Sequence, residues 1–490
     1  MSKAIQGFRL IVVALAICVP GAQAQGTGQA AGQPNVPSAT PPLTESGNPI
    51  GMQEAGTAGQ EPVRTTLYNP PLSGAGDFTP GRSPVTRSFL LPAMNFFQQV
   101  DTRPFTTVQP GSPLALSSIV GSLALQRNSG RSEFTLNYLG GGTVADRQGL
   151  PNAGTSLNSI IQELEATQTV NWRRWTLLTS DQFSYTPESS FGSFLGGLSS
   201  FGSGMGAALG EGLPGLRSFL TPNQSILTGR GGRVSNTFLA QGEYHFTARS
   251  SITIAGAYGF LRFFDSDLLN SNSAMFTTGY NHQITRADTV AVIYRLNAFR
   301  FGGLNRTTDD HVVQLAYGRR ITGRLAFWLN AGPELGLFRS SGIASQRPLL
   351  WNLESELRYR AGRTDLDLFY QHLLTGGAGV LAGAENNLVE AIVNHRLRRM
   401  WRGYLALAYA NNRSVANAGT SLPTQAFNTW FGWVQLSRPI GRSADLVIGY
   451  VVQLQGSDTP LCTGLVCARS LVRHQISLGF NWRHRPIPIG

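Results

Sequence analysis

The sequence predicts an all-β fold, a transmembrane antiparallel up-and-down β-barrel of about 16 strands with a disordered N-terminal arm. Three observations predict it. Charged residues are 13% and hydrophobic residues 41% of the 490 residues, too few charges for a soluble domain and too polar a chain for a helical membrane protein. From about residue 131 onward, segments alternate apolar and polar residues. Short and long connections alternate between these segments, as they do in membrane barrels.

The N-terminus has the layout of a secretory signal peptide. Lys3 and Arg9 precede the apolar run LIVVALAICV, and Ala22 and Ala24 form an Ala-x-Ala cleavage site. We therefore expect residues 1–24 to be removed on export. A lipoprotein attachment site at Cys18 is the alternative, and Ile17 is an unfavourable residue before it.

Three further segments frame the predicted barrel. Residues 25–110 are rich in Pro, Gly, Ser and Thr without apolar periodicity, which predicts a disordered periplasmic arm. Residues 111–130 form a junction that fits either a short helix or a first strand. The barrel is expected over 131–485, followed by a C-terminal tail of 486–490 whose prolines should not pair into the sheet.

Alternation with a period of two defines the predicted strands. In HQISLGFNW, for example, Ile476, Leu478 and Phe480 alternate with Ser477 and Gly479. One face is apolar and the other small or polar, as for a strand between lipid and a wet interior. Sixteen such segments are predicted, at 131–139, 160–172, 174–185, 235–248, 250–264, 273–285, 288–301, 309–320, 324–338, 349–360, 365–374, 386–397, 402–412, 425–437, 443–455 and 471–483.

One hairpin predicts its own register. If AGRT at 361–364 is the turn, Arg360 faces Asp365 and Arg358 faces Asp367 on one side of the hairpin. On the other side, Tyr359 faces Leu366 and Leu357 faces Leu368. Opposite charges and apolar pairs across strands are both favourable. A soluble sandwich with these charges on its solvent face would show the same pairing, so the hairpin alone does not exclude that fold.

Taken together, these features resemble Gram-negative outer-membrane β-barrels, a porin-like superfamily, over residues 131–483. The signal peptide, the alternating segments and the closing strand QISLGFNW carry the resemblance. It implies a location in the cell outer membrane with both termini periplasmic. The partners it implies are outer-membrane lipid and lipopolysaccharide, the outer-membrane assembly machinery and further copies in a homo-oligomer, with no nucleic acid. Such barrels usually end on an aromatic residue, whereas here RHRPIPIG follows Trp482.

Charged residues on the polar face of the predicted strands are candidates for the barrel lumen. Acids and arginines in one lumen resemble the transverse field of porin constrictions, which selects polar or charged solutes. The alternative is that these charges only tie the interior together. The candidates are Glu243, Arg295, Glu334, Glu354, Glu356, Arg358, Arg360, Asp365, Asp367, Glu390 and Arg396.

The stretch FGSFLGGLSSFGSGMGAALGEGLPGL at 191–216 is long and apolar enough to suggest a membrane helix. Its glycine density disfavours a helix, and a span there would put the flanking strands on the wrong sides. We expect instead an external loop that folds into the barrel mouth as a constriction, or a disordered or neighbour-packing loop. The apolar residues expected to line the constriction are Phe191, Phe194, Leu198, Phe201, Met205 and Leu209.

Other site chemistry is sparse. Cys462 and Cys467 are spaced for a disulfide in a short loop, with two free thiols as the alternative. The histidines are scattered, and His245 beside Glu243 is the best candidate for a catalytic pair. We expect no enzyme, cofactor or metal site. Two functions remain, a porin-like passage for small polar or charged solutes or an exported polymer, and a non-conducting barrel that acts as an anchor, adhesin or scaffold.

Overall fold

The computed structural model describes residues 71–74, 88–102, 113–145, 159–186, 226, 232–264, 268–302, 306–340, 343–398, 400–415, 425–458 and 470–489. The chain divides into Met1–Gly47 and Asn48–Gly490, and every described residue belongs to the second unit. The predicted signal peptide, most of the predicted arm, the stretch 191–216 and the pair Cys462 and Cys467 lie outside the described residues.

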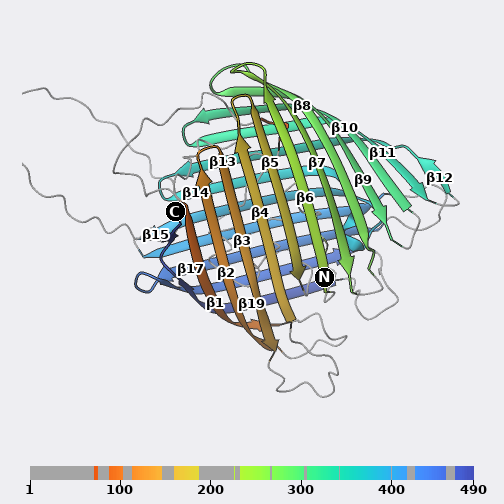
Figure 1. The fold of residues 1–490 in the computed structure, drawn as a ribbon. Coiled ribbons are helices and arrows are strands. Elements are labelled where there is room, and N and C mark those ends of the chain that lie inside the picture. Colours follow the sequence, from red (N-terminus) through yellow and green to blue (C-terminus); the bar gives the residue numbers. More distant parts are fainter. Residues whose placement is uncertain are drawn as a thin grey trace, which may run out of the picture. The chain divides into compact units, whose positions relative to one another are not determined.

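The described residues form one closed antiparallel sheet in which 18 long strands follow each other around a barrel (Figure 1). These strands are β1 (Phe89–Asp101), β2 (Leu114–Ser129), β3 (Ser132–Ala145), β4 (Ser159–Asn171), β5 (Trp175–Thr186), β6 (Arg233–His245), β7 (Ser250–Phe263), β8 (Ser271–Gln283), β9 (Asp288–Phe301), β10 (Arg306–Thr322), β11 (Leu325–Ser340), β13 (Leu349–Ala361), β14 (Thr364–Thr375), β15 (Ala384–Arg398), β16 (Trp401–Ser414), β17 (Ala426–Pro439), β18 (Ala444–Ser457) and β19 (Ser470–Arg483). Three short elements complete the set, namely β12 (Ile343–Gln346), β20 (Ile487–Pro488) and the 3₁₀ helix η2 (Gly377–Gly379).

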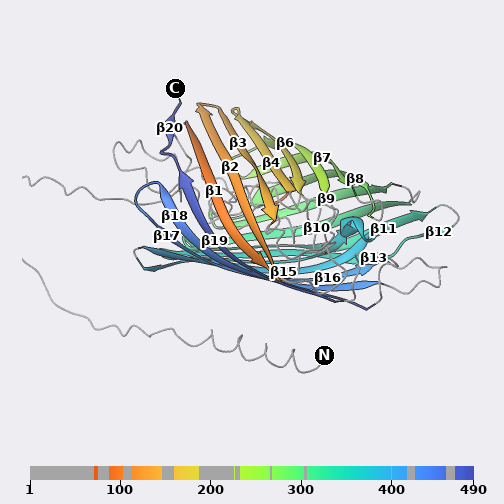
Figure 2. The same cartoon turned by 90° about the horizontal axis from the view of Figure 1, so that it is seen from below.

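The barrel closes between its first and last strands. β1 pairs with β2 on one side and with β19 on the other, and Figure 2 shows β1 next to β19 and β20. The sheet therefore has no free edge among its long strands, which a membrane requires of β-structure. An even strand number brings Phe89 and Arg483 to the same end of the barrel, where the short turns lie. We call this end the short-turn end and the opposite one the long-loop end.

The predicted fold class is confirmed, and the barrel has two strands more than the sequence predicted. All sixteen predicted segments correspond to strands. The two additional ones are β1, which lies within the segment assigned to the arm, and β2, which replaces the undecided junction of 111–130. Both lack a clean alternation, because Phe97 points inward beside the outward Phe96, and β2 has apolar Val120 inward beside Ile119 outward. The barrel thus begins at Phe89 rather than at residue 131.

The C-terminal tail also departs from expectation. The prediction that its prolines stay out of the sheet is wrong, since β20 pairs Ile487 with Leu90 and Pro488 with Phe89. The backbone N–H of Ile489 donates to the carbonyl of Ser88 at 3.2 Å. Proline is tolerated here because β20 is a two-residue pairing at the margin of the sheet.

The register predicted for the β13–β14 hairpin is confirmed. Arg360 faces Asp365, Arg358 faces Asp367, and the predicted apolar pairs also face each other. The turn itself is Gly362 and Arg363, between the paired residues Ala361 and Thr364. Gly362 has φ +39°, a left-handed conformation that tight hairpin turns require.

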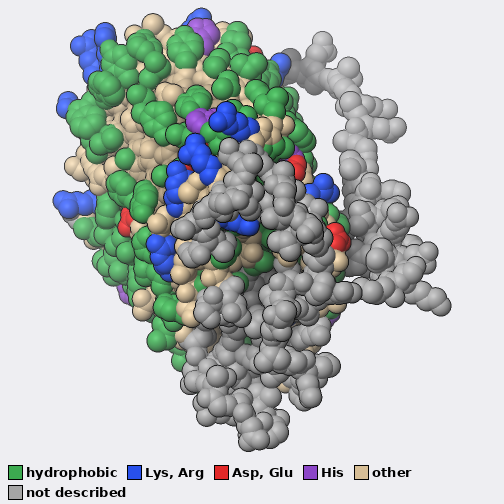
Figure 3. Space-filling model, turned by 90° about the vertical axis from the view of Figure 1, so that its right-hand side faces the viewer, with side chains coloured by type: hydrophobic (Ala, Val, Ile, Leu, Met, Phe, Trp, Pro, Cys, Tyr) green, Lys and Arg blue, Asp and Glu red, His purple; other side chains and the backbone are tan. Residues whose placement is uncertain are grey.

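The two faces of the barrel differ in polarity. Outward side chains such as Ile119, Ile254 and Ile476 are 52–59% exposed although they are apolar. Their inward neighbours include Thr253 and Gln475, which are buried. Figure 3 shows hydrophobic side chains spread over the face that it draws. An apolar exterior over a polar interior is the architecture of a transmembrane β-barrel. Among the described residues, no helix is long and apolar enough to span a membrane.

Gly332 on β11 provides a test of how closely the strands pack. A methyl group at this position would overlap the backbone carbonyl of Val313 on β10. Gly332 precedes Pro333, where the pairing of β11 with β10 is interrupted. We expect Gly332→Ala to lower the free energy of unfolding by about 1–3 kcal/mol, as overpacking does. Gly242→Ala on β6 is the matched control, because nothing lies within 4 Å of the added group. Denaturant unfolding in detergent micelles measures both, and equal losses would contradict the packing argument.

Candidate functional site

The eleven charges proposed for the lumen all lie on the inward face of their strands. On β13, for instance, Glu354, Glu356 and Arg358 are buried, whereas the alternate residues Trp351 and Tyr359 are exposed on the outside. Across β13 and β14 the register gives the same face to Arg360, Asp365 and Asp367. The remaining predicted charges are on β6 (Glu243), β9 (Arg295), β11 (Glu334) and β15 (Glu390 and Arg396).

Arg295 joins two distant strands on the inner face of the barrel. Its Nη1 donates to Oε1 of Glu354 at 2.8 Å, so β9 is linked to β13 across β10 and β11. Both side chains are buried, which makes the ion pair a strong orienting contact rather than a surface pair. Two more buried carboxyls lie on β10 and β11 between them. Asp310 accepts from Asn297 Nδ2 at 3.0 Å, and Glu334 accepts from the backbone N–H of Leu374 at 3.1 Å.

Arg358 is the centre of a second group. Its Nη2 lies 2.7 Å from Oε1 of Glu356, and its Nε lies 3.2 Å from Oδ1 of Asp367. Trp328 Nε1 donates to the other oxygen of Glu356 at 2.7 Å. The arginine is 2% exposed, so one guanidinium neutralises two carboxylates inside the wall. The predicted charges of β9 to β14 therefore make two ionic groups on one side of the interior, and we call this side the charged wall.

Glu243 stands apart from these groups. It lies on β6 near the short-turn end, and its Oε2 is 3.8 Å from Nε2 of His245. This distance between the two atoms is longer than a hydrogen bond. The described residues also contain no group of His, Cys, Asp or Glu that could hold a metal ion.

A neutral polar wall lines the other side of the interior. Asn95 and Gln99 on β1, Gln435 on β17 and Gln453 on β18 are at least nine-tenths buried and face inward. Each carries a side-chain amide atom without a hydrogen-bond partner. Such atoms cost free energy unless water or a solute binds them. Asn95 and Gln99 are not among the predicted lumen residues, because the β1 segment lacks the clean alternation that marks a strand.

The barrel seam is held by a buried ion pair that the sequence analysis also missed. Asp101 at the end of β1 accepts from Arg473 on β19, at 2.8 Å from Nε and 2.5 Å from Nη2. Gln475 Nε2 adds a third hydrogen bond to the same carboxylate oxygen at 3.2 Å. The contact joins residues 372 positions apart. The first and last strands are thus locked together by charge as well as by the backbone ladder.

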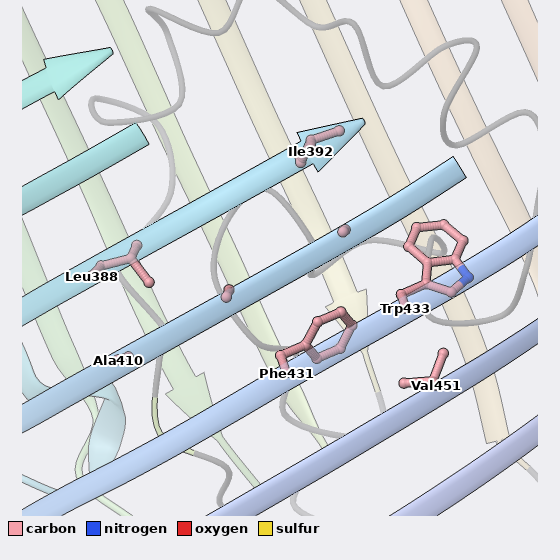
Figure 4. Packing of buried hydrophobic residues seen from close by; sticks show 8 residues of the cluster. Leu388, Ile392, Ala410, Phe431, Trp433 and Val451 are labelled. Atoms are coloured by element: carbon pink, nitrogen blue, oxygen red, sulfur yellow. The ribbon is translucent and has the colours of Figure 1, made fainter. Parts of the chain in front are cut away.

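Apolar side chains cover the interior between the charged wall and the neutral wall. Figure 4 shows Leu388 and Ile392 on β15 near Phe431 and Trp433 on β17. Between them, Ala406, Ala408 and Ala410 of β16 face inward, and these small side chains leave room for the larger ones of the neighbouring strands. The cluster consists of Leu388, Ile392, Ala406, Ala408, Ala410, Phe431, Trp433 and Val451. The interior therefore combines an ionic, an apolar and an uncharged polar surface.

The connection between β14 and β15 folds into the long-loop end of the barrel, and we call residues Gly376–Gly383 the mouth loop. The carbonyl of Gly379 accepts from the backbone N–H of Leu269, in the β7–β8 connection, at 2.7 Å. Gly379 also lies against the ring of Phe263, the last residue of β7. Leu381 is buried against Phe427 of β17 and Ile226. The mouth loop thereby narrows the opening between β7 and β17.

Ile226 is a residue of the long β5–β6 connection that the structure describes. This residue is 1% exposed and packs with Leu381, Ala384 and Phe427, on the side of the barrel opposite to β5 and β6. Ile226 itself therefore lies across the mouth from the strands that it follows and precedes in the sequence. The predicted constriction residues Phe191, Phe194, Leu198, Phe201, Met205 and Leu209 belong to the same connection and lie outside the described residues, so their constriction role stays a prediction.

Comparisons with known proteins add little to this geometry. No protein-family model and no curated protein matches the chain. The chain is similar to OccAB3 of Acinetobacter baumannii at 10% identity and a TM-score of 0.41, covering 82% of this chain and 100% of that chain. It is similar to the outer membrane protein opdK of Pseudomonas aeruginosa at 9% identity and a TM-score of 0.38, covering 81% and 98%. OccK2 (OpdF) of the same organism, in complex with glucuronate, has 10% identity and a TM-score of 0.40, covering 82% and 99%. At these TM-scores the fold rests on the strand register of the chain itself.

Proposed function

We propose that the chain is an outer-membrane β-barrel that forms a porin-like passage for small polar or charged solutes or an exported polymer. One observation carries the proposal. A closed barrel of 18 strands turns buried acids, arginines and amides inward and exposes large apolar side chains on its outside. Barrels of 16 to 18 strands are wide enough to hold an aqueous channel. The interior chemistry favours solutes that carry hydrogen-bonding or ionic groups.

The signal peptide predicted over residues 1–24 supports export, and the apolar exterior supports insertion into a lipid bilayer. We place the protein in the outer membrane with the short-turn end in the periplasm, because outer-membrane barrels have their short turns there. Outer-membrane lipid and lipopolysaccharide are the partners that this placement implies, together with the assembly machinery and further copies in a homo-oligomer.

Planar-bilayer recording tests the passage. We expect purified, folded protein to give steady ohmic current steps that depend on the ion chosen, because the charged wall and the neutral wall differ. Heat-modifiable gel mobility confirms that the recorded sample is folded. Folded protein that stays silent in the bilayer would contradict the passage.

A second function follows from the filled interior. Many inward side chains are buried, and Ile226 and Leu381 pack across the mouth. This observation favours the alternative of a non-conducting barrel that acts as an anchor, adhesin or scaffold. The same recording separates the two functions, since an anchor gives no current.

A further inference from the structure

A piece of the N-terminal segment lies inside the barrel. Pro71–Gly74, which we call the lumen segment, is described apart from its sequence neighbours. The backbone N–H of Ser73 donates to Oδ1 of Asn281 at 3.0 Å, and Nδ2 of Asn281 donates back to Oγ of Ser73 at 2.7 Å. Asn281 faces inward on β8, between the outward residues Tyr280 and His282. The contact therefore lies on the lumen side of the wall.

The wall around Asn281 fits the lumen segment closely. Ser73 sits directly over Gly279, where an added methyl group would overlap its Cβ. Leu72 packs on an apolar cluster formed by Ala291, Ile293 and Ala316. We call Asn281, Gly279 and this apolar cluster the seat.

The amide of Asn281 is held in the orientation that this contact needs. Its Nδ2 also donates to Oγ1 of Thr253 on β7 at 3.2 Å, so the nitrogen points to two hydroxyls and the oxygen is left for the Ser73 N–H. Ser73 is 2% exposed, and a polar backbone at that depth is stable only when it is paired. The seat thus combines a reciprocal hydrogen-bond pair, an apolar surface and a glycine recess for one short peptide.

We propose that the seat is a binding site for the lumen segment, and that the segment acts as a tethered plug which occludes the passage until it is released. Because the two are parts of one chain, the effective local concentration is high and a small contact suffices for occupancy. The same small contact allows release without disturbing the strands. The occlusion rests on the proposed passage, whereas occupation of the seat does not.

Cysteine cross-linking tests the seat independently of conduction. In a full-length chain with Cys462→Ser and Cys467→Ser, we expect Ser73→Cys and Asn281→Cys to form a disulfide in isolated membranes under mild oxidation. The control combines Ser73→Cys with Gln435→Cys, on the neutral wall across the barrel, and should not cross-link. Absence of the Ser73–Asn281 cross-link in folded protein, or equal cross-linking in both pairs, would overturn the seat.

Bilayer recording of the same cross-linked protein tests the occlusion. We expect low conductance while the disulfide is intact and a rise when a thiol reductant is added. Leu72→Asp in the otherwise unchanged chain should raise conductance without oxidation, because a carboxylate cannot remain on the apolar cluster. The matched control is Leu43→Asp, in the other unit of the chain.

The outcomes are distinguishable. A conductance that changes neither with the reductant nor with Leu72→Asp would overturn the plug, while the passage would stand. Protein that forms the cross-link but is silent in every state would overturn the passage, and occlusion with it, while the seat stands.

Discussion

The Arg358→Met variant should lose about 3–5 kcal/mol of unfolding free energy, the range measured when one partner of a buried ion pair is removed. The guanidinium of Arg358 is 2.7 Å from Glu356 and 3.2 Å from Asp367, and the arginine and Glu356 are both buried. Without Arg358, two carboxylates remain on the inner wall with their shared counter-ion gone. Asp367 is a third exposed, so its share of the loss is smaller than that of Glu356. Guanidinium unfolding in detergent micelles, followed by tryptophan fluorescence, measures the loss.

Two further variants show whether the loss comes from uncompensated charge. Arg319→Met removes one partner of Asp288, at 3.6 Å, but the Arg319 side chain is 55% exposed, so we expect a much smaller loss of unfolding free energy than for Arg358→Met. The triple variant Glu356→Gln, Arg358→Met and Asp367→Asn removes the carboxylates together with the arginine. It should recover most of the stability that Arg358→Met loses, because replacing a whole buried ionic group is often neutral. A triple variant as unstable as the single one would assign the loss to packing instead.

The Arg358 group also shows what a sequence of this kind reveals. The charges of β13 and β14 alternate with apolar residues on either side of the AGRT sequence at 361–364. The pattern therefore predicted both the strand register and which side chains share one face of the hairpin. The register of a hairpin with a short turn is set by the turn and by the alternating residues next to it, all of which are adjacent in the sequence. The same reasoning placed all eleven predicted charges on the inner face.

Contacts between distant strands were beyond the reach of the sequence. Arg295 meets Glu354 only because β10 and β11 have the curvature that brings β9 and β13 together. Asp101 meets Arg473 only because the barrel closes after 18 strands, and β1 was hidden by adjacent aromatics at Phe96 and Phe97. The alternation signal weakens wherever an inward position is filled by an apolar side chain. Such positions are the ones at which the interior is packed rather than wet.

The interior therefore has two kinds of filling that sequence patterning could not separate. One filling consists of the ion pairs and amides on the inner face. The other is apolar and consists of the cluster around Trp433 and the contact of Leu72, in the lumen segment, with Ile293. A passage through this barrel has to run between these fillings. If the barrel conducts as proposed, we expect the contacts of the mouth loop and the lumen segment to change its conductance more readily than the ladder-bonded strands do.

The mouth loop contacts β7 and the β7–β8 connection through Gly379. Gly379 has φ +78°, lies against the ring of Phe263 and accepts a hydrogen bond from Leu269. Gly379→Ala strains the backbone by roughly 1–2 kcal/mol, as a non-glycine residue in the left-handed region does. Its methyl group also overlaps the Phe263 ring. We expect the mouth loop to leave β7 and single-channel conductance to rise several-fold.

The control variant Gly441→Ala separates the effect of losing the mouth-loop contact from the effect of backbone strain. Gly441 has the same φ of +78°, in the turn between β17 and β18 at the short-turn end, and nothing lies within 4 Å of an added methyl group. Both variants therefore carry the same backbone strain, but only Gly379→Ala loses a contact across the opening. Similar unfolding midpoints with a conductance increase in Gly379→Ala alone would assign the narrowing to the mouth loop. If Gly379→Ala conducts like the parent protein, the narrowest point lies deeper than the mouth loop, which then only covers the entrance.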